Sequence, residues 1–196
     1  MAGMVTSVSS MFNSPSRSID PGTTQRLYLR ALSSQDATIA YLSWLNDSVI
    51  NRFLHLDSLP ETTDELSAYI ERINSSPTDF LFGVFDAPSH VHVGNIKIGE
   101  INWRHSFAEI GVLIGERGFQ NLGYATDALQ LTIDLAFREF ELHKLIAGIH
   151  ESNENSIRLF EKQGFRLEGI RRKQFIDRAG VRFDGLLYGL FNPRCI

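Results

Sequence analysis

The chain has 196 residues, of which 43% are hydrophobic and 21% are charged, and its formal net charge is −4. These values are ordinary for a globular protein with one substantial core, and the negative charge gives no electrostatic reason to expect a nucleic acid partner. The single cysteine, Cys195, excludes an internal disulfide and a cysteine metal cluster, and no apolar stretch approaches the roughly 18 residues that cross a membrane. We therefore expect a cytoplasmic protein whose partners include neither nucleic acid nor membrane.

The chain divides into a tail and a domain near residue 25. Residues 1–24 are rich in Ser and Thr, and they lack both a regular period and the basic start and apolar core of a secretory signal. We expect residues 1–24 to form a disordered tail and residues 25–196 to form a single domain.

The first half of this domain reads as a strand, two helices and three strands. Residues 26–32 alternate in the manner of a strand. Ser34-Gln35-Asp36 offers an N-cap for a helix that runs through about Trp44, and Thr63-Asp64-Glu65 opens a helix with one apolar face. Turn-rich links then separate three antiparallel strands over residues 80–85, 94–102 and 108–114.

The second half alternates helices with strands. An amphipathic helix over residues 126–140 is followed by a buried strand over residues 145–150 and by a helix that contains residues 156–162. A last pair of strands surrounds residues 177–180. This order predicts an α+β or α/β sandwich around a mixed sheet.

The most informative segment is residues 117–125, which lies between a predicted strand and a predicted helix. A strand, a short turn with two glycines and a helix start leave a row of unpaired backbone N–H groups at the positive end of a helix dipole, which suits a diphosphate. The spacing does not match the GxGxxG dinucleotide fingerprint, and Gly-Tyr-Ala replaces the Gly-Lys-Ser/Thr of a P-loop.

Two ordered motifs carry a resemblance to a known family. Gln120-Asn121-Leu122-Gly123-Tyr124-Ala125 resembles the acetyl-CoA pyrophosphate loop of GNAT N-acetyltransferases, usually written Q/R-x-x-G-x-G/A. The segment from Asn153 to Phe165 is similar to the second signature of that family, N-x-x-A/S-x-x-L-Y/F-x-K-x-G-F. The resemblance covers roughly residues 25 to 191 and is closest to the branch that acetylates ribosomal proteins and amino sugars.

The resemblance implies a GNAT fold, which has a mixed and mostly antiparallel twisted sheet with helices on both faces. It also implies an N-acetyltransferase of the EC 2.3.1 type that uses acetyl-CoA as cosubstrate. Because acetyl-CoA brings its own leaving group, the amine attacks the thioester directly, and the protein holds the reactants, removes a proton and polarises the carbonyl.

The cofactor residues follow from the motif positions. In the family, the strand before the loop exposes its backbone to pantetheine and the thioester, and the loop places N–H groups on the pyrophosphate. Asn153 matches the asparagine that binds the pantetheine arm, although an N-cap of the next helix explains it equally well, and Asn155 is the better cap if that helix begins at Ser156. The expected cofactor contacts are Val112, Leu113, Ile114, Gln120, Asn121, Leu122, Gly123, Tyr124, Ala125, Thr126, Asn153 and Phe160.

Phe160 departs from the family pattern. Many GNAT enzymes have a tyrosine there that is thought to protonate the departing thiolate, and phenylalanine has no proton to give. A thiol with a pKa near about 8.5 leaves as a tolerable thiolate, so water can serve instead. Tyr124 is a remote substitute that we place on the cofactor loop.

Three residues are candidates for the base that deprotonates the amine. Glu109, on the strand that enters the cofactor site, comes first, and Glu100 on the preceding strand comes second; both also read as solvent-facing strand carboxylates. His105 lies in the turn that we expect near the mouth of the acceptor cleft. His90 and His92 have no third partner with metal-ligand spacing, so we expect no metal.

The sequence does not identify the amine that accepts the acetyl group. Residues 41–75 and the loop around Trp103 should shape its pocket, and they contain Trp44, Asn51, Arg52, Phe53, His55 and Trp103. Their resemblance to enzymes acting on nucleotide-linked amino sugars suggests such an acceptor, with a protein N-terminus, a polyamine or a drug amine as alternatives. Trp44, Leu45 and Phe53 also read simply as core of the first helical pair. An idle acyl-CoA sensor on the same fold is the non-enzymatic alternative. A homodimer through the C-terminal strands is common in the family, and nothing in the sequence decides it.

Overall fold

A computed structural model describes residues 18–19, 24, 26–54, 58–176 and 180–195. Within these residues, eight strands form one sheet in the order β1-β2-β3-β4-β5-β6-β8-β7. The strands are β1 Ser18–Ile19, β2 Leu27–Ala31, β3 Phe80–Asp86, β4 His92–Asn102, β5 Phe107–Ile114, β6 Lys144–His150, β7 Arg166–Ile176 and β8 Arg182–Phe191. The helices are α2 Ile39–Asn46, α3 Thr63–Asn74, α4 Tyr124–Arg138 and α5 Glu154–Lys162, with the short 3-10 helices η1 Ser34–Asp36, η2 Asn51–Phe53, η3 Arg117–Phe119 and η4 Pro193–Cys195.

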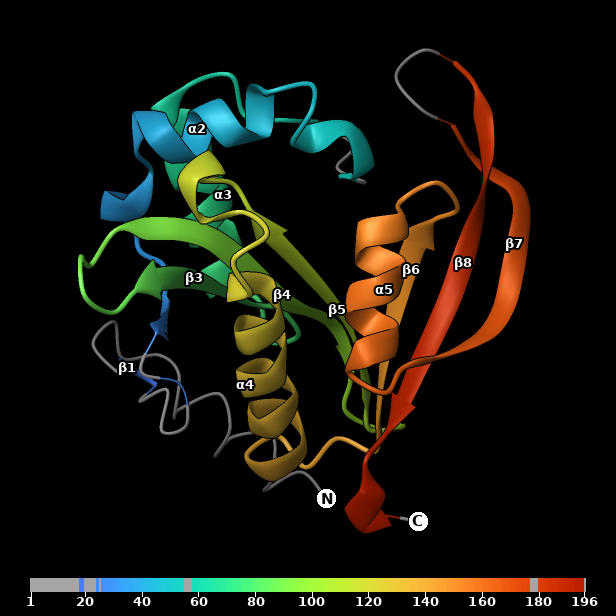
Figure 1. Cartoon of the computed structure of the whole chain (residues 1–196). Coiled ribbons are helices and arrows are strands. Elements are labelled where there is room, and N and C mark those ends of the chain that lie inside the picture. The colour runs from blue at the N-terminus through green and yellow to red at the C-terminus, as the bar shows by residue number, and fades with distance from the viewer. Residues whose placement is uncertain (1–17, 20–23, 25, 55–57, 177–179, 196) are drawn as a thin grey trace.

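Helices cover both faces of the sheet, as expected for the fold (Figure 1). Side chains of α4 and α5 pack with one face of the strands from β2 to β8 in the larger core cluster. Side chains of α2 and α3 pack on the other face in a smaller cluster with β3. The mixed, mostly antiparallel sheet with helices on both faces is therefore confirmed.

The pair β5–β6 is the parallel one in this sheet, and it positions the site. The two strands pair through Phe107↔Lys144, Ala108↔Leu145 and Glu109↔Ile146. Beyond Glu109 the described pairing stops, and Figure 1 shows the two strands diverging toward the ends from which α4 and α5 are reached. A parallel pair requires a crossover, and here α4 supplies it.

The helix predicted to run from Asp36 through Trp44 is divided in two. The Asp36 carboxylate accepts the backbone N–H of Ser33 at 2.7 Å and bonds Arg30, and this caps η1. Thr38 then acts as a new N-cap, with its hydroxyl accepting the Tyr41 N–H at 3.2 Å, and α2 begins at Ile39. The two local caps therefore stabilise two short helices in place of one continuous helix.

The expected disordered tail falls mostly outside the described residues. Two of its members, Ser18 and Ile19, form β1 and pair with Arg30 and Leu29 of β2. The turn at Asp177–Ala179 and His55 also lie outside the described part of the chain.

Candidate active site

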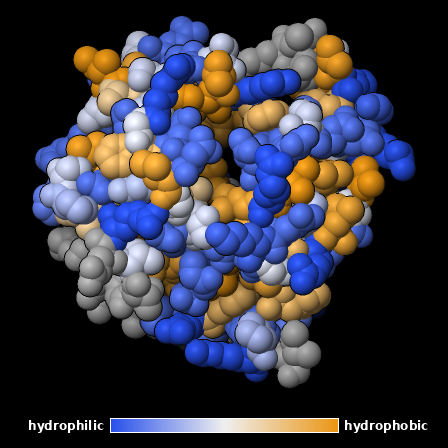
Figure 2. Space-filling view, in the orientation of Figure 1, coloured by the Kyte–Doolittle hydropathy of each residue, from blue (hydrophilic) through white to orange (hydrophobic). Residues whose placement is uncertain are grey.

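The opening between β5 and β6 is the centre of the candidate site. Figure 2 shows that the surface in this region is hollowed between the two halves of the molecule, with hydrophobic side chains in its walls. Both α4 and α5 start on the side where the strands diverge (Figure 1), so the positive ends of two helix dipoles lie near it. This arrangement suits a long ligand that carries negative charge.

Residues 117–125, which lead from β5 into the start of α4, have the geometry of an anion-binding turn; we call them the cofactor turn because the sequence predicts cofactor binding there. Gly123 is the N-cap of α4 with φ of 91°, and it offers no side chain to cap the helix. The N–H groups of Tyr124, Ala125 and Thr126, in the first turn of α4, consequently have no acceptor within the helix. The helix begins two residues earlier than the predicted start at Thr126, so Tyr124 and Ala125, which were expected to donate from the loop, lie in the first turn of the helix.

The expectation for Gln120 needs correction. Its backbone N–H donates to the Arg117 carbonyl at 3.3 Å, so that group is used inside η3. The Gln120 side chain instead donates to the Ile114 carbonyl at 3.0 Å and fastens the turn to the end of β5. The exposed Asn121 and Leu122 follow, and Asn121 has φ of 58°, which lets the chain reverse before Gly123.

Tyr124 contributes a backbone group to the turn but no side chain to the opening. Its ring is buried and packs edge-on against Phe119 at 5.2 Å. Its hydroxyl donates to Asp86. Burial, together with this carboxylate, raises the pKa of Tyr124 to about 12. Tyr124 is therefore unsuited to replace the missing tyrosine as a proton donor.

The end of β5 presents backbone to the opening. Val112 and Ile114 pack against the larger core under α4, whereas Leu113 packs against the α2–α3 cluster. All three lie beyond the last described pair with β6, so their backbone groups on that side have no strand partner. Such a free edge supports the expected main-chain contacts with pantetheine.

Asn153, rather than Asn155, is the N-cap of α5. The helix begins at Glu154, and the Asn153 side chain accepts the Ser156 N–H at 3.2 Å. The alternative placement of the cap at Asn155 is wrong because that side chain accepts a hydrogen bond from Arg158 on the helix surface. The Asn153 NH₂ group is not part of the cap, so a contact with pantetheine stays compatible with it.

Glu109 lies where β5 and β6 begin to diverge. It is the last β5 residue paired with β6, and it shares a sheet face with Leu113 of the α2–α3 cluster. Burial, followed by the nearby Glu100 carboxylate, raises the pKa of the Glu109 carboxyl group. A half-buried carboxylate with a raised pKa is suited to accept a proton from an amine.

Two glycines leave space beside Glu109. Gly111 on β5 and Gly148 on β6 share its face of the sheet, and a Cβ atom at Gly111 would meet nothing within 4 Å. A Cβ atom at Gly148 would lie 3.3 Å from a Glu109 carboxylate oxygen. An amine could therefore approach Glu109 from this side without displacing a side chain.

Glu100 reaches the same region through a bulge. The pairing of β4 with β5 is irregular between Gly99 and Asn102, and Glu100 has φ of 53° within that interval. The bulge exposes Glu100 next to Glu109, which pairs with Gly99. The structure thus joins the two carboxylates that the sequence offered as separate candidates.

His105 does not lie beside the cofactor turn, whereas Trp103 lines a pocket together with Glu100. Both lie in the turn between β4 and β5, at the end where β5 is paired with β6 rather than at the end beside the cofactor turn. The Trp103 indole donates to the Pro77 carbonyl at 3.0 Å, and its ring packs edge-on against Phe140 behind α4. The Asn102 side chain accepts the His105 backbone N–H at 3.0 Å. Because the exposed His105 lies at the end away from the cofactor turn, Glu109 remains the first candidate for the base.

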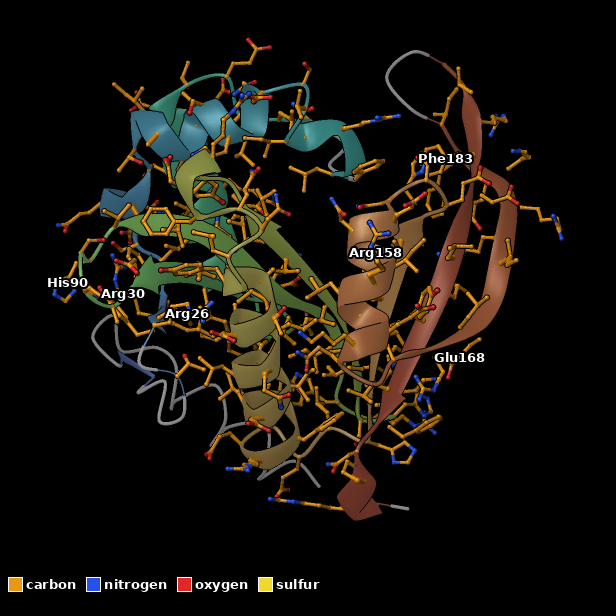
Figure 3. The ribbon with its side chains drawn as sticks, in the orientation of Figure 1. Arg26, Arg30, His90, Arg158, Glu168 and Phe183 are labelled. Carbon is orange, nitrogen blue, oxygen red and sulfur yellow. The ribbon has the colours of Figure 1, made fainter. Side chains whose placement is uncertain are left out.

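On the α2 side, an aromatic cluster that the sequence did not reveal borders the opening. His150, at the end of β6, stacks on Phe183 of β8 at 3.7 Å and contacts Phe53 of η2 at 5.2 Å (Phe183 is labelled in Figure 3). Asn51, by contrast, is buried and donates to the Leu45 carbonyl, so its role is structural. The aromatic contacts of His150 join residues that are far apart in the chain, and no local pattern indicates them.

Comparisons with known proteins identify the family. The model of the GNAT acetyltransferase domain matches residues 26–166. The chain belongs to the GNAT acetyltransferase family. The probable N-acetyltransferase YjcK of Bacillus subtilis is 32% identical over 129 residues, covering 65% of this chain and 70% of the relative.

Solved and curated polyamine enzymes also resemble this GNAT chain. The structure of spermidine N-acetyltransferase from Vibrio cholerae in complex with CoA and spermine superposes with a TM-score of 0.78 at 25% identity, covering 86% of this chain and 97% of that one. The Escherichia coli (strain K12) spermidine N(1)-acetyltransferase is 34% identical over 89 residues, or 45% of this chain and 47% of the relative. The predicted ribosomal-protein and amino-sugar branch is not established by these relatives.

The GNAT chain is accordingly an acyltransferase that uses acetyl-CoA as cosubstrate to acetylate an amine. Its Phe160 is buried in the larger core and packs edge-on against Phe165 at 4.9 Å. The proton donor found in many family members is therefore absent from this position.

No helix among the described residues is long and apolar enough to span a membrane. In the same part of the chain, no group of three or more His, Cys, Asp or Glu side chains is arranged to hold a metal ion.

Proposed function

We propose that this GNAT enzyme acetylates a primary amine of a small cationic acceptor of the polyamine type. The observation that carries the proposal is the proximity of Glu100 and Glu109 on the α2–α3 face, beside the space above Gly111 and Gly148. Two carboxylates attract a cationic amine against the smaller opposing effects of Arg171 and Lys97, and the spermidine acetyltransferases among the similar proteins support this acceptor class.

The roles of the site residues follow from their positions. Acetyl-CoA lies between the diverging strands, with its diphosphate on the N–H groups from Asn121 to Thr126 and its thioester beside the β5 edge. The acceptor enters from the opposite face, and Glu109 takes a proton from its ammonium group. The free amine then attacks the thioester carbonyl and a C–N bond forms; the nitrogen releases its second proton to solvent, and the C–S bond breaks.

The thiolate leaves without a tyrosine donor. Phe160 supplies no proton, and the Tyr124 hydroxyl is held by Asp86. Solvent protonates the departing thiolate, whose pKa near about 8.5 makes it a tolerable leaving group at neutral pH.

A panel of amines tests the acceptor class. Purified protein is mixed with acetyl-CoA and spermidine, spermine, a nucleotide-linked amino sugar or a peptide with a free N-terminus, and thiol release is followed. We expect turnover to be fastest with the polyamines. A preference for the amino sugar or the peptide would reject the polyamine assignment, and CoA binding without any turnover would favour the sensor alternative.

A variant at Gly111 tests the direction of approach. Gly111→Val fills the space beside Glu109 from a position where added atoms meet no existing contact. We expect the KM for the amine to rise by about tenfold or more while the Kd for CoA stays unchanged, because the added side chain occupies the acceptor space and leaves the cofactor contacts intact. Gly118→Ala, also in open space but outside this face, serves as the matched control.

A further inference from the structure

The side of the cofactor turn that faces away from α5 is held by Arg26. Its guanidinium donates from Nη1 to the Leu122 carbonyl, although the two residues are 96 positions apart. The backbone of Arg26 is fixed in turn, because its carbonyl accepts the Ala87 N–H at 2.8 Å. Figure 3 shows Arg26 beside the start of α4, on the side of that helix opposite to α5.

The contact with Leu122 determines where the neighbouring N–H group points. A peptide group is planar and trans, so the carbonyl of Leu122 and the N–H of Gly123 point in opposite directions. Since Arg26 holds the carbonyl on its own side, the Gly123 N–H is directed to the other side of the turn. The same contact keeps an electronegative carbonyl oxygen away from any anion that the turn binds.

Arg26 also offsets a negative charge at the start of α4. Its Nε lies 3.5 Å from the carboxylate of Asp127, which is in the first turn of that helix. An unpaired carboxylate at this position would repel a diphosphate bound by the same turn. The ion pair reduces that repulsion without placing Asp127 in contact with the ligand.

The glycine of the motif makes room for this arrangement. A Cβ atom at Gly123 would lie 2.6 Å from Nη1 of Arg26, and the residue has φ of 91°. The left-handed backbone favours glycine at this position, and an added Cβ would push the flexible end of the Arg26 side chain away from the turn.

We propose that Arg26 is a positioning residue for acetyl-CoA, which orients the backbone of the cofactor turn toward the diphosphate and neutralises Asp127. This inference rests on the proposed placement of the diphosphate at the turn. Arg26 acts from behind the turn and does not touch the cofactor.

A truncated cosubstrate tests this role. Acetyl-pantetheine carries the thioester and the pantetheine arm but no diphosphate, so it should be insensitive to the state of the turn. We expect Arg26→Ala to raise the KM for acetyl-CoA by about tenfold or more, the range for loss of a hydrogen bond with a charged donor, with little change in kcat. The kcat/KM for acetyl-pantetheine should stay within about twofold of the unmodified enzyme, and Arg26→Lys should restore part of the loss.

A second pair of variants separates the two effects of Arg26. Asp127→Asn in the Arg26→Ala background removes the unpaired carboxylate, so it should recover the part of the KM increase that comes from charge. The part that comes from the lost hydrogen bond to the Leu122 carbonyl should remain. Arg30→Ala is the matched control, because Arg30 lies on β2, which follows directly after Arg26, and pairs with Asp36, away from the turn. It should change neither KM.

The outcomes distinguish this inference from the cofactor placement itself. Equal losses with acetyl-CoA and acetyl-pantetheine in Arg26→Ala would show that Arg26 only supports the fold, and would overturn the proposal. Equal use of the two cosubstrates by the unmodified enzyme would instead show that the turn does not bind the diphosphate.

Discussion

At the scale of single residues, the environment of Glu109 links reactivity to stability. Burial and the proximity of Glu100 disfavour its charged form in the folded protein. A carboxyl group whose pKa is raised on folding stabilises the fold below its unfolded pKa, and that contribution is lost as the pH rises through the folded pKa. At neutral pH the ionised Glu109 therefore costs stability while it serves as a base.

The variant Glu109→Gln should separate these two effects. We expect kcat to fall by about 10²- to 10⁴-fold, the usual contribution of a general base, while the melting temperature at neutral pH rises. Enzyme assays and calorimetry measure the two quantities. Undiminished turnover would move the base to another residue, with Glu100 next in order.

The variant Glu100→Gln should shift the pH profile of the enzyme. Glu100 is the second largest cause of the raised Glu109 pKa, so its neutralisation lowers that pKa. The acid limb of kcat/KM against pH then moves to lower pH, because Glu109 becomes a free carboxylate earlier. Glu139→Gln, at the C-terminal end of α4, should leave the limb in place. An unmoved limb in Glu100→Gln would mean that Glu109 does not control it.

At the scale of elements, the start of α5 depends on one side chain with two separate polar groups. The Asn153 side-chain oxygen accepts the Ser156 N–H and caps the helix, and its NH₂ group takes no part in that bond. The sequence predicts a cap and a pantetheine contact equally, and the geometry of the cap is compatible with both.

Two substitutions at Asn153 distinguish the roles. Asn153→Ala should lower the free energy of unfolding by about 0.5–2 kcal/mol through loss of the cap. Asn153→Asp keeps an oxygen acceptor at the helix start, so it should preserve stability and raise the KM for acetyl-CoA if the NH₂ group binds pantetheine. Urea denaturation and kinetics provide the measurements. Asn155→Ala, on the exposed surface of α5, is the control, and an unchanged KM in Asn153→Asp would leave Asn153 as a cap alone.

At the scale of the whole molecule, α2 is joined to the segment that leads into the cofactor turn. The Trp44 ring lies directly on Gly115, where an added Cβ would meet ring atoms at 2.1–2.4 Å. Asp47, just after α2, pairs with Arg117 of η3 at 2.5 Å. The α2–α3 cluster and the cofactor turn are therefore linked by direct contacts.

The variant Gly115→Ala tests this connection. Forcing a methyl group into the contact should cost about 1–3 kcal/mol of stability, the range for overpacking. Because Trp44 contacts the segment that leads into the turn, we also expect the KM values for both the amine and acetyl-CoA to rise. Gly118→Ala, three residues further on in open space, should change neither stability nor either KM. A loss of stability with unchanged kinetics would show that the contact does not reach the site.

The sequence by itself determined the family and the fold class, and it predicted a glycine-containing turn between β5 and α4 as the place for the cofactor. These follow from local information: the glycines at 118 and 123, the alternation of β3 to β5, and the two motifs are each contained within short segments. Local caps and periods depend on neighbours along the chain, so most helices and strands were predicted close to their observed bounds.

Only the tertiary structure decided which side chains meet. The pairing of Glu100 with Glu109 depends on a bulge in β4, the aromatic cluster at His150 depends on the register of β6 and β8, and the contact of Arg26 with Leu122 spans most of the chain. The misplacement of His105 has the same origin, because the end of β5 that opens is set by where its pairing with β6 stops. Register and strand divergence are sums of many distant packing contacts, and no short stretch of sequence encodes them.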